Sequence, residues 1–234
     1  MPPPKASVEE IRSRFDNDVE RFSNLDTGQA STIDAPLVME LIAQAAAACN
    51  PGGTELLDLG CGAGNYSIKL RELLPSLHVT LVDLSRPMLD RASERLGDAV
   101  RTAVQGDIRD IELYESSFDI VVASAVLHHL RTDAEWRAVF AKVHRALKPG
   151  GSFWIADLIE HSTAAVQQLM WKRYGDYLSS VKGDAYRDNV FDYVQYEDTP
   201  RPLLYQLDLL RETGFGPVEV LHKNSCFAAF GAVK

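Results

Sequence analysis

The sequence predicts an α/β fold, in which a doubly wound and mostly parallel sheet carries helices on both faces. Three observations predict it. Strand-like runs alternate with helix-like segments along most of the chain, several of those runs are apolar throughout, and two further runs close the chain. Strands that are apolar on both sides suit a sheet that helices cover on both faces. The length of 234 residues fits one domain with modest additions.

Five strands are expected within the alternating part, and helices fill the gaps between them. One helix starts at residues 132–135, which match a capping box, and stops at the Lys-Pro-Gly-Gly turn of residues 148–151. Others occupy residues 85–97 and the segment before Gly214. The expected strands span residues 55–59, 78–84, 100–104, 118–123 and 152–158.

The two closing runs, residues 218–222 and 226–233, are separated by only three residues. A link this short joins antiparallel strands, because a parallel pair needs a crossover of about a dozen residues or more. We therefore expect an antiparallel C-terminal hairpin beside the parallel strands.

Two segments lie outside the alternation. Residues 1–35 form a polar leader that carries Phe15 and Phe22 among charged residues, and residues 158–202 form an insertion rich in aromatic side chains. We expect the leader to act as a lid and residues 36–234 to form the main domain, with the insertion covering its site. Connections as long as this insertion tend to be functional.

Charge and cysteine content limit the partners. The formal net charge is −9, whereas a large nucleic-acid footprint needs a basic surface, so we expect no nucleic-acid partner. Cys49, Cys61 and Cys226 are too few for a disulfide framework and lack metal-ligand spacing, so we expect no metal.

Nothing in the sequence indicates a membrane protein. No apolar run approaches the roughly 20 residues that a membrane span needs. The first five residues, Met-Pro-Pro-Pro-Lys, lack the apolar core of a secretory signal. We expect a cytoplasmic protein, and the sequence does not indicate its oligomeric state.

The strongest motif is the segment 56–66, Leu-Leu-Asp-Leu-Gly-Cys-Gly-Ala-Gly-Asn-Tyr, where a buried strand runs into a loop with glycine at every second position. Glycines let the chain turn sharply and let a ligand lie against the backbone, and the amides of the following helix favour a polar group. By itself such a loop also fits a tight strand-to-helix turn.

Two further acids follow neighbouring strands. Asp83 ends the second strand, where a carboxylate can accept both hydroxyls of a ribose, and Ser85 is better suited than Asp83 to cap the next helix. Asp107 follows the third strand and can accept a hydrogen bond from an adenine amino group, with Leu84 and Ile108 as apolar walls. A loop aspartate is also a common turn residue.

Together these segments resemble the successive motifs of class I S-adenosylmethionine-dependent methyltransferases over roughly residues 36–160, with the strand at 118–121 and the turn at 147–151 completing the series. The resemblance implies a Rossmann-like seven-stranded sheet, S-adenosylmethionine as cofactor and S-adenosylhomocysteine as product. It implies a cofactor site made of Asp58, Gly60, Cys61, Gly62, Gly64, Asp83, Leu84, Met88, Asp107, Ile108 and Ser124.

An NAD(P)-dependent oxidoreductase is the main alternative on the glycine loop alone. Its usual spacing is G-x-G-x-x-G, whereas here Asn65 stands where the third glycine would be and Gly64 comes one place early. A cofactor-binding domain without activity is a further alternative. The spacing and the Lys-Pro-Gly-Gly turn favour methyl transfer.

The sequence defines the methyl acceptor less well than it defines the cofactor. Methyl transfer depends mainly on proximity and alignment, and a base is needed only if the acceptor must lose a proton. His128 and His129, at the end of the fourth strand, are candidate catalytic residues because histidine titrates near neutral pH. The sequence favours the alternative that both cap the strand and bond to neighbouring loops. The Asn- or Asp-Pro-Pro-Tyr motif of enzymes that methylate exocyclic or amide nitrogens is missing there.

Aromatic residues of the insertion favour a small organic acceptor. Trp171, Tyr174 and Tyr177 follow helical spacing and are candidates for an acceptor pocket, or else pack the insertion onto the core. The insertion also faintly resembles carboxy-S-adenosylmethionine synthase, which modifies the cofactor and needs an arginine that Arg187 or Arg201 would supply.

Overall fold

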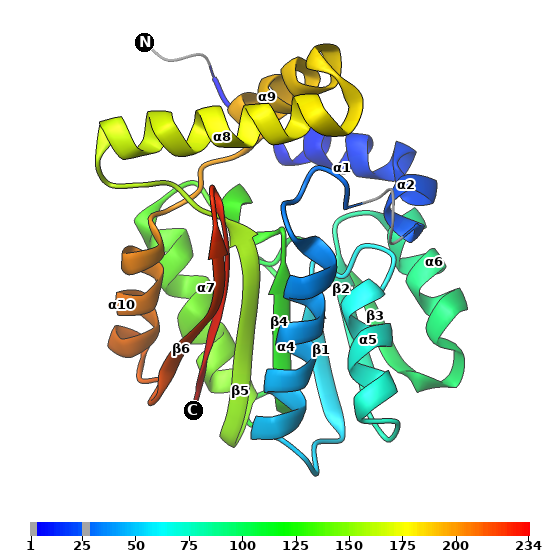
Figure 1. Cartoon of the computed structure of the whole chain (residues 1–234). Helices are drawn as coiled ribbons and strands as arrows, with labels where there is room; N and C mark the ends of the chain where they lie inside the picture. Colours follow the sequence, from blue (N-terminus) through cyan, green and yellow to red (C-terminus); the bar gives the residue numbers. More distant parts are fainter. Residues whose placement is uncertain (1–3, 25–28) are drawn as a thin grey trace.

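The computed structural model describes residues 4–24 and 29–234. Within this part of the chain, seven strands form one sheet in the order β3-β2-β1-β4-β5-β7-β6 (Figure 1). The first five strands are parallel to one another, and β7 is antiparallel to both β5 and β6. The expected doubly wound sheet with an antiparallel C-terminal hairpin is confirmed. The strands are β1 (Glu55–Leu59), β2 (His78–Asp83), β3 (Val100–Gln105), β4 (Phe118–Ser124), β5 (Leu147–Leu158), β6 (Val218–Asn224) and β7 (Phe227–Val233).

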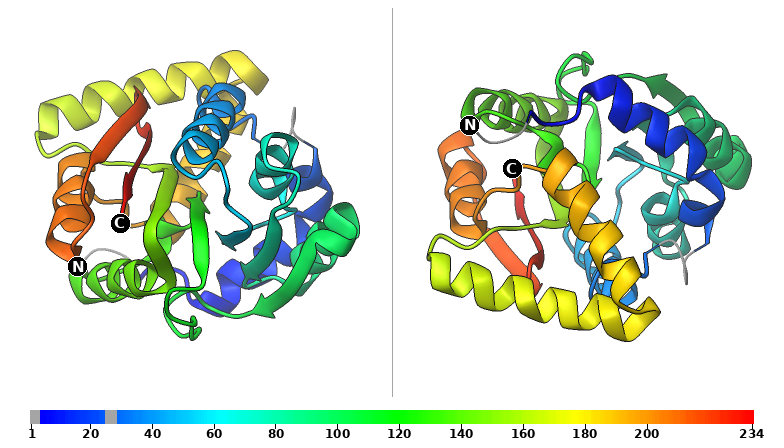
Figure 2. Two further views of the ribbon diagram at one scale, coloured as in Figure 1. Left: turned by 90° about the horizontal axis from the view of Figure 1, so that it is seen from below. Right: turned by 90° about the horizontal axis from the view of Figure 1, so that it is seen from above.

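Helices cover both faces of this sheet (Figure 2). One face packs against α4, α5 and α6, and the other against α7 and α10, so that each face has its own apolar core. The α-helices are α1 (Val8–Asn17), α2 (Val19–Ser23), α4 (Ala35–Cys49), α5 (Asn65–Leu73), α6 (Arg86–Leu96), α7 (Asp133–Ala146), α8 (Ala164–Lys182), α9 (Asp184–Glu197) and α10 (Leu203–Thr213).

Local signals in the sequence explain where these elements begin and end. Thr132 caps α7 in the expected capping box with Glu135, and Ser85 caps α6 by accepting a hydrogen bond from the amide of Met88. The Lys-Pro-Gly-Gly turn does end α7, but it already belongs to β5, which starts at Leu147. The hairpin link is two residues long, one fewer than expected, and Ser225 adopts a positive φ of 48° there.

The strand register brings the carboxyl ends of the parallel strands to one edge of the sheet. Leu59 of β1 pairs with Val82 of β2 and with Ala123 of β4, and Ser124 pairs with Ala156 of β5. The loops that follow these strands therefore meet at the same edge, which is where open α/β sheets bind ligands.

The insertion and the leader cover that edge. The insertion forms α8 and α9, which cross the top of the sheet in Figure 1 with α1 beside them. An apolar cluster that includes Tyr174, Leu178, Val190 and Leu158 packs the insertion onto the end of β5. The view from above in Figure 2 shows α1, α8 and α9 spread over the carboxyl edge.

None of the helices in the described part of the chain is long and apolar enough to cross a membrane.

Candidate functional site

A cavity of about 220 Å³ opens at the carboxyl edge, between the strand loops and the overlying helices. Ten of the eleven residues predicted to bind the cofactor line it, whereas Gly64 does not. His128, His129 and Tyr174 line it as well, together with residues of α1, α2 and α9. The cofactor residues in its wall are Asp58, Gly60, Cys61, Gly62, Asp83, Leu84, Met88, Asp107, Ile108 and Ser124.

The loop after β1 contains three glycines with positive φ: Gly60 at 66°, Gly62 at 50° and Gly64 at 80°. The space around each of them differs. A Cβ on Gly60 would come within 2.6 Å of Val126, and one on Gly64 within 3.2 Å of Ala92 in α6. A Cβ on Gly62 would meet nothing within 4 Å. Gly62 therefore leaves open space beside the cavity, as a backbone that supports a ligand requires.

Asp83 ties this loop to the next strand. One oxygen of its carboxylate accepts the backbone amide of Gly62 at 2.8 Å, and the other accepts the amide of Ser85 at 2.8 Å. Burial raises the pKa of Asp83 to about 6, and the two amide bonds oppose that rise. The carboxylate is therefore fixed in orientation at the cavity wall, where its remaining lone pairs can accept hydroxyl groups.

Asp58 lies deeper, beneath the glycine loop. It is fully buried and accepts a hydrogen bond from the hydroxyl of Ser67 at 2.6 Å. Burial raises its pKa to about 7, and the neighbouring Asp83 adds to the rise. The phenol of Tyr66 is also buried and bonds to Ser124, and burial raises its pKa. Polar groups from the ends of β1 and β4 thus meet at the base of the cavity.

Asp107 is held by a neighbour that the sequence argument did not consider. Both of its oxygens bind the guanidinium of Arg109, with one contact of 2.9 Å from Nε, and Arg109 also pairs with Glu135 at 3.0 Å. Burial acts to raise the pKa of Asp107, but the hydrogen bonds from Arg109 outweigh it and lower the pKa. Asp107 is therefore an ionised acceptor at the cavity wall.

His128 is bonded to a buried carboxylate. Its Nδ1 bonds to Asp157 at the end of β5, and the other oxygen of Asp157 accepts the backbone amides of Leu127 at 2.9 Å and His128 at 3.2 Å. Burial acts to lower the pKa of His128, but Asp157 and Asp198 outweigh it and raise the pKa to about 9. Without another ligand, His128 is therefore a cation at neutral pH, oriented by Asp157.

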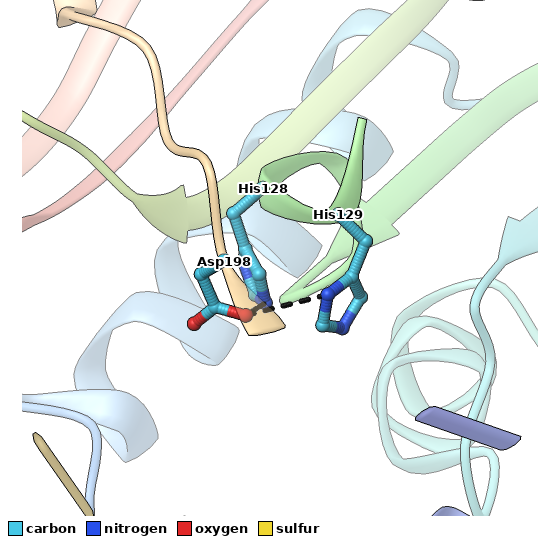
Figure 3. A group of neighbouring side chains, drawn as sticks. All are labelled: His128, His129 and Asp198. Atoms are coloured by element: carbon cyan, nitrogen blue, oxygen red, sulfur yellow. Dashed lines mark ion pairs between the residues drawn. The ribbon is translucent and has the colours of Figure 1, made fainter. Parts of the chain in front are cut away.

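His129 has the opposite character. Burial and the neighbouring His128 lower its pKa well below the usual value, so the ring is neutral. Neither ring nitrogen has a hydrogen-bond partner within the described residues. Figure 3 shows the two histidine side chains converging on Asp198, whose Oδ1 lies 3.3 Å from Nδ1 of His129 and 3.6 Å from Nε2 of His128.

The leader is fastened to the insertion directly above these residues. Arg14 of α1 binds both oxygens of Glu197 at the end of α9, with distances of 2.6 to 2.9 Å. The amide of Ala6 donates to the carbonyl oxygen of Tyr196 at 3.0 Å. Phe15 packs edge-on against His129, with 6.0 Å between ring centroids. The leader thus forms part of the cavity wall.

The three aromatic residues proposed for the acceptor pocket have separate positions. Tyr174 lines the cavity and donates its hydroxyl to the carbonyl of Ser31 at 2.8 Å. The ring of Trp171 instead stacks on the ring of Phe191, with 4.6 Å between ring centroids, and this contact joins α8 to α9. The hydroxyl of Tyr177 donates to the backbone carbonyl of Ala30 at 3.0 Å. Trp171 and Tyr177 lie outside the cavity wall because the next helix and the preceding loop cover them.

The arginines considered for a cofactor carboxylate are engaged elsewhere. Arg187 pairs with Asp184 and Asp188 on its own helix, and Arg201 pairs with Asp133 at the start of α7. Neither lines the cavity, whereas Arg14 and Arg21 do.

Several residues at the site went unnoticed in the sequence. Asp157 lies next to the end of β5, a position like that of Asp83 at the end of β2, from which it could have been predicted. Asp198, Arg14 and Tyr193 come from the insertion and the leader, where no repeated pattern marks them, and only the packing of these segments brings them to the cavity.

Comparisons with known proteins agree with this geometry. A family model described as a methyltransferase domain matches residues 56–151. YqeM of Bacillus subtilis, a protein named as a methyltransferase, is 31% identical over 70% of this chain and 74% of its own length. An uncharacterized methyltransferase of Mycobacterium tuberculosis is 32% identical over 52% of this chain. The match covers 58% of that relative's length.

Solved structures share the fold across the whole chain. The 1,6-didemethyltoxoflavin-N1-methyltransferase of Burkholderia thailandensis, solved with its acceptor and S-adenosylhomocysteine, matches with a TM-score of 0.65 at 20% identity. That match covers 100% of this chain and 93% of the other. A phosphoethanolamine N-methyltransferase of Haemonchus contortus matches with a TM-score of 0.66 at 20% identity, over 98% of this chain and 60% of the other.

Proposed function

Because the chain belongs to the methyltransferase family, we propose that it transfers a methyl group from S-adenosylmethionine to a small organic acceptor and releases S-adenosylhomocysteine. The resemblance to class I methyltransferases is confirmed by these matches, and membership favours methyl transfer over hydride transfer. One observation carries the proposal: a single cavity joins the glycine loop, Asp83 and Asp107 to the His128–His129–Asp198 cluster.

The cofactor half of the cavity fits S-adenosylmethionine. The open space beside Gly62 suits the methionine part, Asp83 offers a fixed carboxylate for the ribose hydroxyls, and Asp107 is an ionised acceptor for the adenine amino group. Ile108 and Leu84 supply apolar surface beside Asp107. The bound cofactor supplies a methyl group on a sulfonium, and the protein's part is to hold and align the partners.

We assign the acceptor to the other half, between the cofactor loops and the covering helices. His129 is neutral there with unpartnered nitrogens, so it can accept a hydrogen bond or a proton from an acceptor, while Asp157 holds His128 in place. Phe15 and Tyr174 supply apolar surface, and the hydroxyl of Tyr174 is already engaged. This set suits a compact molecule with an apolar body and one polar reacting group.

A small acceptor also agrees with the enclosure of the site. Helices α1, α8 and α9 lie over the carboxyl edge, and the cavity is about 220 Å³. The toxoflavin-precursor methyltransferase, which has the same fold over this whole chain, was solved with a small acceptor. The net charge of −9 opposes a nucleic-acid acceptor.

We extend the proposal to the organisation of the chain. The leader, of which residues 4–24 and 29–35 are described, serves as a lid over the domain formed by residues 36–234, and residues 158–202 roof the acceptor. The bonds of Arg14 and Ala6 to α9 support this division, because they join the lid to the roof. A joined cover excludes water from the reaction and holds the acceptor in place.

A ligand panel followed by a transfer assay tests the proposal. S-adenosylhomocysteine should raise the melting temperature of the protein by mass action, and NADH and NADP should not. Incubation of the protein with methyl-labelled S-adenosylmethionine and a library of small metabolites should then yield a labelled small product, detected by mass spectrometry. A larger shift with NADH, or label found only on nucleic acid or protein, would contradict it.

A further inference from the structure

The side chains of His128, His129 and Asp198 bring three metal-binding atoms together at the acceptor end of the cavity. One ligand atom from each lies within 4.8 Å of the other two. We propose that this cluster binds a divalent transition-metal ion, with Zn²⁺ the best match. Two imidazoles and a carboxylate are a common ligand set for that ion.

Two distances within the cluster are close to those around a tetrahedral ion, and all three ligand atoms lie within 4.8 Å of one another. Ligand atoms on a tetrahedral ion with bonds of about 2.0–2.1 Å are separated by about 3.4 Å, and neighbouring ligands on an octahedral ion by about 3.0 Å. Oδ1 of Asp198 lies 3.3 Å from His129 and 3.6 Å from His128. These separations need little adjustment to close around Zn²⁺.

Asp157 provides the outer support that metal-binding histidines usually have. It bonds to Nδ1 of His128 and is itself fixed by the backbone amides of Leu127 and His128. An imidazole bonded to a carboxylate through one nitrogen presents the other nitrogen to a metal in a fixed direction. In this structure that second nitrogen, Nε2, faces Asp198 (Figure 3).

His129 supplies an independent observation that points to a ligand here. Both of its ring nitrogens are buried and neither has a hydrogen-bond partner within the described residues. A buried polar atom without a partner is destabilising. A metal on Nδ1 would satisfy one of these atoms at the position nearest Asp198.

The arginines beside the cluster are held by other partners. Arg14 is the nearest cation from α1, but its guanidinium is bound to both oxygens of Glu197 and lies 3.7 Å from Asp18. Arg131 donates to the backbone carbonyls of Glu197 and Ala6. The carboxylates of Asp157 and Asp198 contribute negative charge next to the cluster, which favours a divalent ion.

The cluster has the open position that catalytic metal sites keep. Three protein ligands leave the fourth tetrahedral position free, and all three residues line the cavity. This reading rests on the proposed function: the open position would receive the reacting group of the acceptor, a hydroxyl, thiol or amine. The metal ion, and not the unpartnered imidazole of His129, would then orient the acceptor.

Cobalt binding to the full-length chain tests the site without any assay of turnover. The protein is first treated with a chelator and then titrated with Co²⁺, whose visible absorption distinguishes tetrahedral from octahedral coordination. We expect one equivalent to give the intense tetrahedral bands and Zn²⁺ to displace it. His129→Asn and Asp198→Asn should weaken binding at least 100-fold, and Asp157→Asn about 10- to 100-fold.

His222→Asn is the matched control, because His222 also lies beside a carboxylate, 3.1 Å from Asp34, but on β6. It should bind Co²⁺ as the wild type does. S-adenosylhomocysteine binding by each variant shows whether it is folded and tests the proposed function separately. Absence of the tetrahedral bands in wild-type protein that binds S-adenosylhomocysteine would overturn the metal site. Co²⁺ binding by His129→Asn and Asp198→Asn that is as tight as in the wild type would also overturn it.

Discussion

The carboxylate of Asp83 accepts the backbone amide of Gly62 at 2.8 Å and so joins the end of β2 to the glycine loop that follows β1. One side chain thereby shapes the loop and presents a ribose-binding group beside it. Its second oxygen accepts the amide of Ser85, at the start of α6. The cofactor half of the site is therefore a single hydrogen-bonded unit built from two adjacent strand ends.

Replacing Asp83 by Asn should weaken binding of S-adenosylhomocysteine about 10- to 100-fold, as expected for a lost charge-assisted hydrogen bond of about 1.5–3 kcal/mol. Isothermal calorimetry measures the change. Asp110→Asn, in the loop after β3, is the control, because Asp110 does not line the cavity. An unchanged dissociation constant in Asp83→Asn would remove ribose binding from the role of Asp83.

Comparison of Gly60→Ala with Gly62→Ala should distinguish the effect of the glycine loop on stability from its effect on cofactor binding. Both positions have positive φ, so each substitution costs about 1–2 kcal/mol of stability. Gly60→Ala also forces a Cβ against Val126 and should cost about 1–3 kcal/mol more. Gly62→Ala meets no protein atom but fills the space beside the cavity, so it should lose more cofactor affinity than stability. Urea unfolding and calorimetry on both variants provide the comparison.

Asp58 should make stability depend on pH in a predictable direction. Its pKa in the folded protein, about 7, is above the ordinary value of 3.8. Its favourable contribution is therefore fully present below about pH 4 and is lost as the pH rises through 7. Asn at this position cannot ionise and keeps an acceptor for Ser67. The stability of Asp58→Asn relative to wild type should therefore rise between pH 5 and pH 8 in urea unfolding.

Asp119→Asn is the control for that experiment. Burial acts to raise the pKa of Asp119, but its bonds to Lys148 and to the amides of Thr54 and Glu55 outweigh it and lower the pKa. Asp119 is thus ionised throughout the range from pH 5 to pH 8, and its variant should show a constant difference from wild type. Asp83 titrates in the same window in all three proteins, so its contribution largely cancels. If the stability difference between Asp58→Asn and wild type did not change with pH, the raised pKa of Asp58 would be refuted.

The sequence predicted the sheet and the cofactor half well because both follow from local patterns. The apolar run before Asp58, the glycine spacing and the capping residues Ser85 and Thr132 each act over a few neighbouring positions. Strand ends then meet at one edge by the geometry of a parallel sheet. Gly64 is the exception: it packs against α6, and no local pattern distinguishes packing from ligand contact.

The acceptor half was harder to predict because it depends on how distant segments pack. Asp198 is brought to His129 by the fold of the insertion, and Trp171 and Tyr177 were candidates only because they share the spacing of Tyr174. Helical spacing tells which residues share a face and not what covers it. Neighbouring helices decide that, and here they cover two of the three aromatic residues.

The last prediction concerns the joint cover formed by the leader and the insertion. Arg14→Gln should release α1 from α9, because it removes the guanidinium that makes three hydrogen bonds to the nearly buried Glu197. Amide hydrogen exchange should then become faster in α1 and at the end of α9, while exchange in the central strands β1 and β4 stays unchanged. Arg12→Gln is the control, since Arg12 belongs to the same helix but pairs, among the described residues, only with the exposed Glu9.

Ligand binding should reveal the joint cover of the leader and the insertion in the wild-type protein as well. S-adenosylhomocysteine occupies the space under the cover, so both segments should exchange more slowly when it is bound, and Arg14→Gln should lose much of that protection. The variant should also retain the cofactor less well, because the cover closes over it. Protection confined to the glycine loop and Asp83 would show that the cofactor binds without the cover. Equal exchange in Arg14→Gln and Arg12→Gln would show that the bond to Glu197 does not hold the two segments together.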